Sequence, residues 1–200
     1  MYKLLTPQEK YWLGFIATDG SIDLKTKSLS IELAAIDLRQ VKEFIKFHKS
    51  KATPYYRESR DTYRGRIGAA KFLPILSSYG IAPRKTYTLE VSPLLTSSKE
   101  FWLGVMDGDG YFRYWKDNNG WRNHRVTLTT ASEAFADQFI EYMKTLGLNP
   151  HKYWHKQTNC WKPGVCNRIE CDIFLNEIYS SDVYCLERKL SKYLEIGKES

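Results

Sequence analysis

The sequence predicts an α+β protein of two pseudo-symmetric halves, each ordered helix, two strands, helix, two strands, helix. Two observations predict this fold class. An apolar segment that ends in Asp-Gly occurs at residues 11–20 and again at residues 101–110, and the residues that follow the two copies are also similar. Such a repeat indicates two copies of one structural unit. We expect residues 1–92 and 98–200 to form the two halves, and residues 93–97 to link them.

The repeated segment is predicted to be a helix in both halves. Each copy follows a hydroxyl residue and, three positions later, a glutamate, at residues 6–9 and 97–100. This pattern is typical of a helix start. Gly14 and Gly104 lie in the middle of these helices, where glycine costs about 1 kcal/mol relative to alanine. Close packing of the two helix backbones along Gly14 and Gly104 would explain these glycines.

Each of these helices ends in an aspartate, Asp19 in the first half and Asp109 in the second. If the helices pack together, the two carboxylates lie side by side at helix ends that already carry partial negative charge. A divalent cation that prefers oxygen ligands would relieve this repulsion, and Mg²⁺ fits that preference. The sequence therefore predicts a metal-binding pair of carboxylates between the halves.

The remaining elements follow from apolar periodicity and capping signals. Further helices are predicted near residues 37–50, 70–79, 132–146, 171–180 and 185–195. Strands are predicted near residues 21–25, 28–35, 52–59 and 62–68, and near 111–116, 124–130, 151–157 and 164–170. Leu29, Ile31 and Leu33 alternate with polar residues, so one face of each sheet should pack on helices while the polar face stays open.

The open faces are suited to contact nucleic acid. The net charge of +7 and the pI near 9.1 favour a polyanionic partner, and residues 1–97 hold the whole excess, with 16 Lys and Arg against 9 Asp and Glu. Arg, Lys, Thr, Tyr and His can reach base edges and phosphates; the alternative is that these side chains are simply solvated. The DNA-binding candidates of the first half are Ser28, Ser30, Glu32, Tyr55, Arg57, Arg60, Arg64 and Arg66. Those of the second half are Arg113, Trp115, Arg125, Thr127, Thr129, His151, Tyr153, His155, Lys162, Asn167 and Arg168.

The two Asp-Gly segments resemble the paired motifs of the LAGLIDADG homing endonucleases, in the monomeric form with both motifs in one chain. The glycine at the third place and the closing Asp-Gly agree in both copies, at residues 12–20 and 102–110. The acid that is usual at the sixth place is Ala17 in the first copy and Asp107 in the second. The resemblance implies that the motif helices pack at the centre and that two antiparallel sheets form a DNA-binding saddle.

The resemblance also implies a function, the site-specific hydrolysis of both strands of a long asymmetric DNA target across the minor groove, as in intron homing. Mg²⁺ would be the cofactor, with Mn²⁺ able to substitute and Ca²⁺ supporting binding without turnover. Lys85 and Lys189 match the family's basic residue after the fourth strand, although a role in capping or solvation stays equally open. The implied site comprises the metal-binding and catalytic Asp19 and Asp109, the backbone carbonyls of Thr18 and Gly108, and the basic candidates Lys85 and Lys189.

An alternative function is that of a non-cleaving relative, such as an intron maturase or a transcriptional regulator. Retention of both aspartates favours the nuclease, acting as a monomer on double-stranded DNA, with its own intron RNA as a second candidate partner. The four cysteines form no Cys-x-x-Cys pair, which argues against structural zinc and fits a reducing compartment. Without a signal peptide or an apolar span, the expected location is intracellular, in a prokaryotic cytoplasm or an organelle, with no membrane partner.

Overall fold

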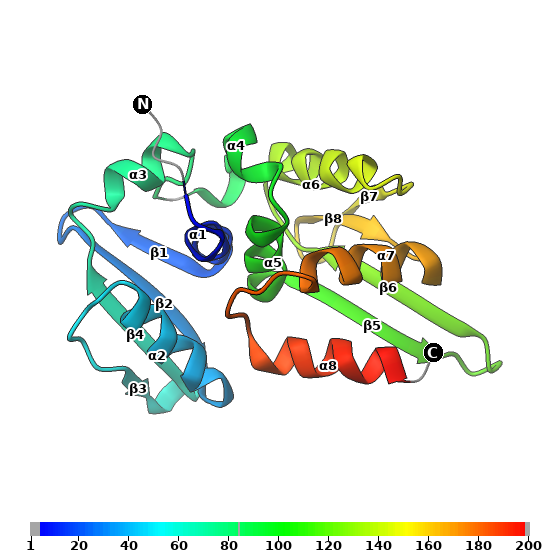
Figure 1. Ribbon diagram of the computed structural model, residues 1–200, viewed down its shortest axis with the longest axis horizontal. Coiled ribbons are helices and arrows are strands. Elements are labelled where there is room, and N and C mark those ends of the chain that lie inside the picture. Colours follow the sequence, from blue (N-terminus) through cyan, green and yellow to red (C-terminus); the bar gives the residue numbers. More distant parts are fainter. Residues whose placement is uncertain (1–4, 84, 199–200) are drawn as a thin grey trace.

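The computed structural model describes residues 5–83 and 85–198, and within them two four-stranded antiparallel sheets flank a central pair of helices (Figure 1). The central helices are α1 (Pro7–Asp19) and α5 (Lys99–Gly108). The sheets have the strand orders β1-β2-β4-β3 and β5-β6-β8-β7, so equivalent strands occupy equivalent places. The predicted fold class of two α+β halves related by a repeat is therefore confirmed.

The helices and strands of each half follow the order that the repeat predicts. In the first half they are β1 (Gly20–Asp23), β2 (Ser28–Ala34), α2 (Leu38–Phe47), β3 (Tyr55–Arg57), β4 (Thr62–Gly68) and α3 (Leu73–Ser78). In the second half they are β5 (Gly110–Lys116), β6 (Arg122–Leu128), α6 (Glu133–Thr145), β7 (His151–His155), β8 (Cys160–Val165), α7 (Arg168–Tyr179) and α8 (Glu187–Lys198). The expected linker contains a short helix, α4 (Pro93–Thr96). Single 3-10 turns cover Ala35–Asp37, Glu58–Arg60 and Lys85–Tyr87.

One predicted strand was wrong. The strand expected at residues 164–170 ends at Val165, and α7 begins at Arg168. The reason is a helix cap, because the side chain of Asn167 accepts a hydrogen bond from the backbone N–H of Glu170 at 2.9 Å. The first N–H groups of a helix have no partner within the helix, and this bond satisfies one of them. The cap therefore favours a helix start at this position over a continued strand.

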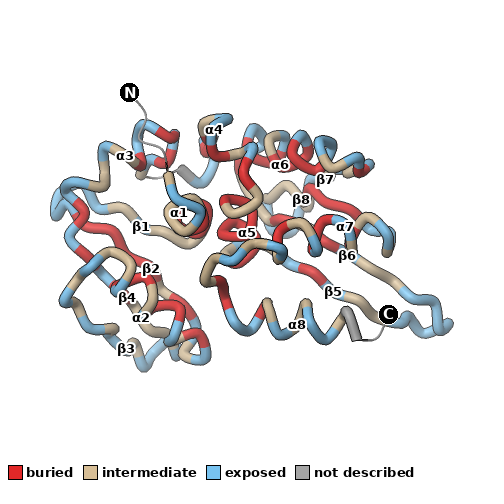
Figure 2. The backbone as a smooth tube through the Cα atoms, viewed as in Figure 1, coloured by how far each residue is buried: buried red, intermediate tan, exposed pale blue. Residues whose placement is uncertain are grey.

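The centre of the molecule is a tightly packed pair of helices. A Cβ atom added to Gly14 would lie 2.0 Å from the carbonyl oxygen of Phe101, and one added to Gly104 would lie 2.0 Å from that of Tyr11. Only glycine fits at these two positions. The buried stretches of both helices lie at the centre of the molecule (Figure 2), and the side chains of Trp12 and the other buried residues of α1 pack there.

A segment near the C-terminus connects the two halves a second time, and we call residues 184–189 the C-terminal clasp. The backbone N–H of Tyr184 donates to the side chain of Gln8 at 2.8 Å, and the Gln8 amide donates back to the Tyr184 carbonyl at 3.2 Å. Arg188 makes a two-pronged ion pair with Asp37, at 3.2 and 3.0 Å. The side chain of Asp37 therefore serves this contact instead of capping α2, and the second half is fastened to the first.

Candidate functional site

The two motif aspartates lie at the same end of the central helix pair. Asp19 is the last residue of α1, and Asp109 is the residue that caps the C-terminal end of α5. The hydroxyl of Thr18 lies only 2.0 Å, and a carboxylate oxygen of Asp19 only 3.3 Å, from where a Cβ of Gly108 would be. The end of α1 is thus in direct contact with the end of α5, and the chain leaves both helix ends directly into the first strand of each sheet.

A cavity of about 260 Å³ opens beside Asp109. Thr18 from α1 and Thr129 after β6 line this cavity, which brings together both halves of the chain. The side chain of Lys85 lies outside the part of the chain that is described, but its neighbour Thr86 also lines the cavity. Three lining residues that the sequence interpretation missed are Thr86, Thr130 and Cys160. No pattern in the sequence marks them, because tertiary packing brings together the turn that holds Thr86, the segment after β6 that holds Thr130, and the first residue of β8, Cys160.

The amino group of Lys189 is held at the C-terminal end of α5. It donates to the carbonyl oxygens of Met106 at 2.5 Å, Asp107 at 2.8 Å, Gly110 at 2.8 Å and Gly108 at 3.4 Å. Carbonyls at a helix end lack partners within the helix and carry partial negative charge, so an ammonium group is favourable there. These contacts are those of a cap, which was one of the two roles open to Lys189. The longest of these contacts, at 3.4 Å, is to the carbonyl of Gly108, which is also a predicted metal ligand.

Lys189 also lies within electrostatic reach of both motif aspartates. Burial lowers the pKa of Lys189 to about 8, although the negative charges of Asp107, Asp19 and Asp109 oppose this shift. The three acids thus surround one buried amine.

A buried hydrogen-bonded network, which the sequence interpretation missed, crosses the helix pair at Asp107. The hydroxyl of Tyr11 donates to the Asp107 carboxylate at 2.8 Å, and the backbone N–H of Leu186 donates to the same oxygen at 2.7 Å. Gln40 donates to the Tyr11 oxygen at 2.6 Å. The sequence held one signal of this network: the sixth place of the motif is an acid, Asp107, in the second copy but an alanine, Ala17, in the first.

Burial raises the pKa of Asp107 from 3.8 to about 6. The unfolded chain therefore loses this proton at lower pH than the folded chain, and the contribution of Asp107 to stability falls as the pH rises from about 4 to about 6. Relative to Asp107→Asn, the free energy of unfolding of the unmutated protein should drop by about 3 kcal/mol across this window. Urea unfolding of both proteins at several pH values measures the difference. Parallel pH dependences would contradict the assignment.

The second half of the chain matches a known domain family. Residues 97–179 match the family model of the LAGLIDADG-like domain. No curated protein is significantly similar to the chain in sequence.

The fold of the whole chain matches solved structures at low sequence identity. I-LtrWI bound to target DNA has a TM-score of 0.67 at 10% identity, over 95% of this chain and 89% of that chain. I-SmaMI bound to uncleavable DNA has a TM-score of 0.70 at 14% identity, over 97% and 90%. I-AabMI bound to uncleaved DNA has a TM-score of 0.69 at 12% identity, over 97% and 91%. The chain has the LAGLIDADG homing endonuclease fold.

On the open face of the first sheet, side chains are hydrogen-bonded to one another. Ser28 and Ser30, two of the DNA-binding candidates, are buried. Arg66 donates to the hydroxyl of Ser28 at 2.9 Å, and Arg64 donates to that of Ser30 at 2.9 Å. The arginines therefore cover the serines, and it is the guanidinium groups that this part of the sheet presents.

The same face carries an acid between the arginines. Arg57 donates to Glu32 at 2.9 Å, and Thr62 donates to it at 3.0 Å, while Arg60 lies 3.8 Å away. Tyr55 stands opposite Arg64 in the strand register and is exposed. A polyanion that bound here would have to compete with Glu32 for these guanidinium groups.

The open face of the second LAGLIDADG sheet follows the predicted alternation. The strand register places on it Arg113, Trp115, Arg125, Thr127, His151, Tyr153 and His155. Lys162 lies opposite Tyr153 and donates to the hydroxyl of Thr129 at 2.5 Å, and Thr129 lines the cavity beside Asp109. Asn167 and Arg168 do not lie on this face, because they begin α7 on the side that the helices cover.

The donor set at the helix ends suits a hard divalent cation. Two carboxylates and the carbonyls near them are oxygen ligands, which Mg²⁺ prefers, and substrate phosphates and water commonly complete its shell. Residues 5–83 and 85–198 contain no group of three or more His, Cys, Asp and Glu that could hold a metal alone. No helix within these residues has the length and apolar character to cross a membrane.

Proposed function

We propose that this protein is a site-specific DNA endonuclease that hydrolyses both strands of a long asymmetric duplex. The observation that carries the proposal is the contact between the ends of α1 and α5, which places Asp19 and Asp109 together between two sheets with basic open faces. The fold supports it, since solved structures with this fold include homing endonucleases bound to DNA. The first and second sheets present different side chains, which fits a target without two-fold symmetry.

In this proposal the carboxylates of Asp19 and Asp109 bind the catalytic metal, with the carbonyls of Thr18 and Gly108. A bound divalent ion supplies an activated water and stabilises charge on the phosphate and the leaving oxygen. Lys189 positions Asp109, because it fixes the carbonyls on both sides of that residue. Lys85, which directly precedes Thr86 of the cavity lining, is the candidate for contact with a phosphate or a water.

The open faces bind the duplex in this proposal. Arg57, Arg64 and Arg66 would release their partners within the sheet in exchange for phosphates or guanine edges. On the second sheet, the alternating His151, Tyr153 and His155 would contact different bases. The minor groove then faces the helix ends, where one aspartate serves each strand.

The test is the selection of cleaved sites from a randomised duplex library with purified protein and Mg²⁺. We expect one family of long asymmetric sites with both strands cut. Replacement of Mg²⁺ by Ca²⁺ should keep binding and abolish cutting, because calcium coordination is looser and positions water poorly. A protein that enriches a specific sequence but never cuts it would contradict the proposal and indicate a non-cleaving binding protein.

A further inference from the structure

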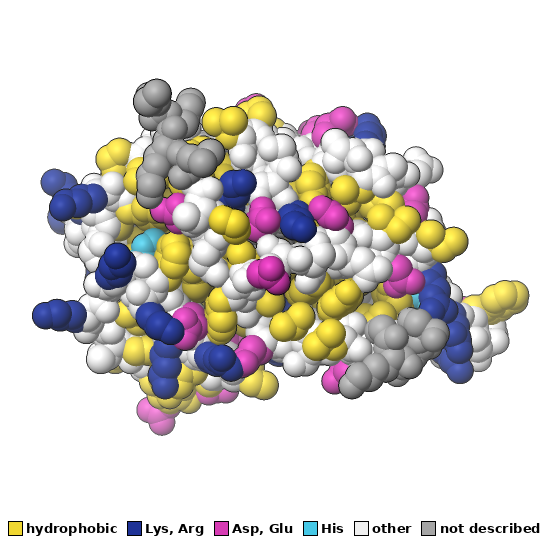
Figure 3. All heavy atoms as spheres, viewed as in Figure 1, with side chains coloured by type: hydrophobic (Ala, Val, Ile, Leu, Met, Phe, Trp, Pro, Cys, Tyr) yellow, Lys and Arg dark blue, Asp and Glu magenta, His cyan; other side chains and the backbone are white. Residues whose placement is uncertain are grey.

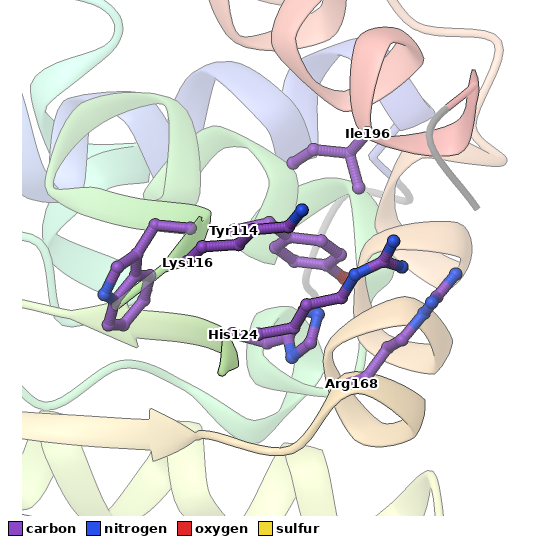
Figure 4. Close-up of a pocket in the computed structure, with 7 residues that line it drawn as sticks. Tyr114, Lys116, His124, Arg168 and Ile196 are labelled. Atoms are coloured by element: carbon purple, nitrogen blue, oxygen red, sulfur yellow. The ribbon is translucent and has the colours of Figure 1, made fainter. Parts of the chain in front are cut away.

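A second cavity lies far from the helix ends, at the outer end of β5 and β6. Its volume is about 580 Å³, which lies in the range of small-molecule sites. Figure 4 shows Tyr114 and His124 side by side, with Arg168 of α7 and Ile196 of α8 at the edges of the cavity. The other lining residues are Trp115, Lys116 and Arg122.

This cavity opens on the opposite side of the sheet from the proposed DNA-binding face. Tyr114 and His124 are paired in the strand register, and both alternate with Arg113 and Arg125 of the open face. They share the side of buried Phe112, and the cavity also includes the first residue of α7, Arg168, and Ile196 near the end of α8. A duplex on the open face would therefore leave this cavity accessible.

The cavity is positively charged. Lys116, Arg122 and Arg168 line it, and dark blue side chains gather at this end of the molecule in Figure 3. The nearby acid is Asp172, which accepts hydrogen bonds from Tyr114 at 2.5 Å and forms an ion pair with Arg168 at 3.5 Å. Among the residues described, no carboxylate forms an ion pair with Lys116 or Arg122.

Two aromatic side chains lie beside these cations. The rings of Tyr114 and His124 meet edge to face, with centroids 4.5 Å apart. Burial, and then the charge of Arg168, lowers the pKa of His124, so its ring is neutral at pH 7. Guanidinium groups bind phosphate oxygens in a fixed fork, while aromatic faces stack on nucleobases.

We propose that this cavity binds a nucleoside 5′-phosphate, either as a free nucleotide or as an unpaired nucleotide of a nucleic-acid strand. Arg122 and Arg168 hold the phosphate, and Tyr114 and His124 contact the base. The site is separate from the proposed cleavage site, since its lining residues other than Trp115 belong to the covered side of the second sheet or to the helices that cover it. Three properties of the cavity identify the ligand class: its positive charge, its aromatic side chains and its volume.

Isothermal titration of the full-length protein with AMP, adenosine and inorganic phosphate tests the ligand class. We expect saturable binding of AMP, weaker binding of phosphate and no binding of adenosine. A single-stranded oligonucleotide in a fourth titration distinguishes the sources, because tighter binding than AMP indicates a strand and equal or weaker binding indicates the free nucleotide. Adenosine binding as strong as AMP, phosphate binding as strong as AMP, or no binding of AMP at millimolar concentration would overturn the proposal.

Two variants and a matched control locate the site. Arg122→Ala and Arg168→Ala should each weaken AMP binding by about tenfold or more, since each removes a charge-assisted hydrogen bond. Arg113→Ala, on the same strand pair but on the open face, should change AMP affinity less than twofold. The Arg122 side chain is exposed, so that variant should fold normally even if Arg168→Ala, which loses its ion pair with Asp172, does not. An affinity that falls for Arg113→Ala and not for Arg122→Ala would place the ligand on the other face.

Discussion

Asp19→Asn and Asp109→Asn are each expected to reduce the rate of double-strand cleavage on the order of a thousandfold, with little loss of DNA affinity. The amide keeps the shape of the side chain but removes the negative charge that would bind the divalent ion. In the proposed complex the sheet faces, and not the helix ends, contact the bases, so DNA affinity should persist. Cleavage of a selected site in Mg²⁺, and binding of the same duplex in Ca²⁺, measure the two effects separately.

Glu141→Gln is a matched control for these variants. It makes the same change from carboxylate to amide, on an exposed position of α6 whose only ion pair within the described chain is with Lys144. Its cleavage rate should equal that of the unmutated protein. Full cleavage by either aspartate variant would remove that residue from the proposed site. Loss of one strand cut alone would show that each aspartate serves one strand.

Gly104→Ala is expected to lower the free energy of unfolding by about 3 kcal/mol or more, and Gly14→Ala by a similar amount. The new methyl group would meet a backbone carbonyl oxygen at 2.0 Å, and a backbone oxygen in the middle of a helix cannot rotate away. The two helices would have to separate, which opens the most buried part of the molecule and moves Asp19 relative to Asp109. Urea denaturation followed by circular dichroism measures the loss.

Gly68→Ala provides the control for a change from glycine to alanine. Gly68 ends β4, and an added Cβ would meet no atom within 4 Å. Its stability should stay within about 1 kcal/mol of the unmutated protein. If Gly104→Ala were as stable as Gly68→Ala, the close contact between α1 and α5 would be incorrect.

The sequence was informative where a local pattern decides the structure. The repeated motif, with a glycine in each copy and an Asp-Gly end, predicted both central helices, and alternation predicted the burial of Leu29, Ile31 and Leu33 in β2. Each of these signals lies within one element. The same reasoning failed at residues 164–170, where the cap formed by Asn167 ended the strand early.

Contacts between distant parts of the chain could not be predicted. The network at Asp107 needs Gln40 from α2 and the backbone of Leu186, and no spacing in the sequence brings them together. The burial of Ser28 depends on the side chain of Arg66 lying across it, which alternation alone does not indicate. The cavity beside Tyr114 and His124 likewise combines residues of β5 and β6 with Arg168 and Ile196, which are distant in the sequence.

The C-terminal clasp has a consequence for exchanging halves between related proteins. Gln8 and Asp37 belong to the first half, while Tyr184 and Arg188, which grip them, come from the end of the second. In a chimera joined within the linker, the C-terminal clasp of one protein would therefore meet the first half of another, which need not carry its partner residues. Grafts that transfer Gln8 and Asp37 along with the foreign second half should assemble, whereas those that omit them should hold their halves together less firmly.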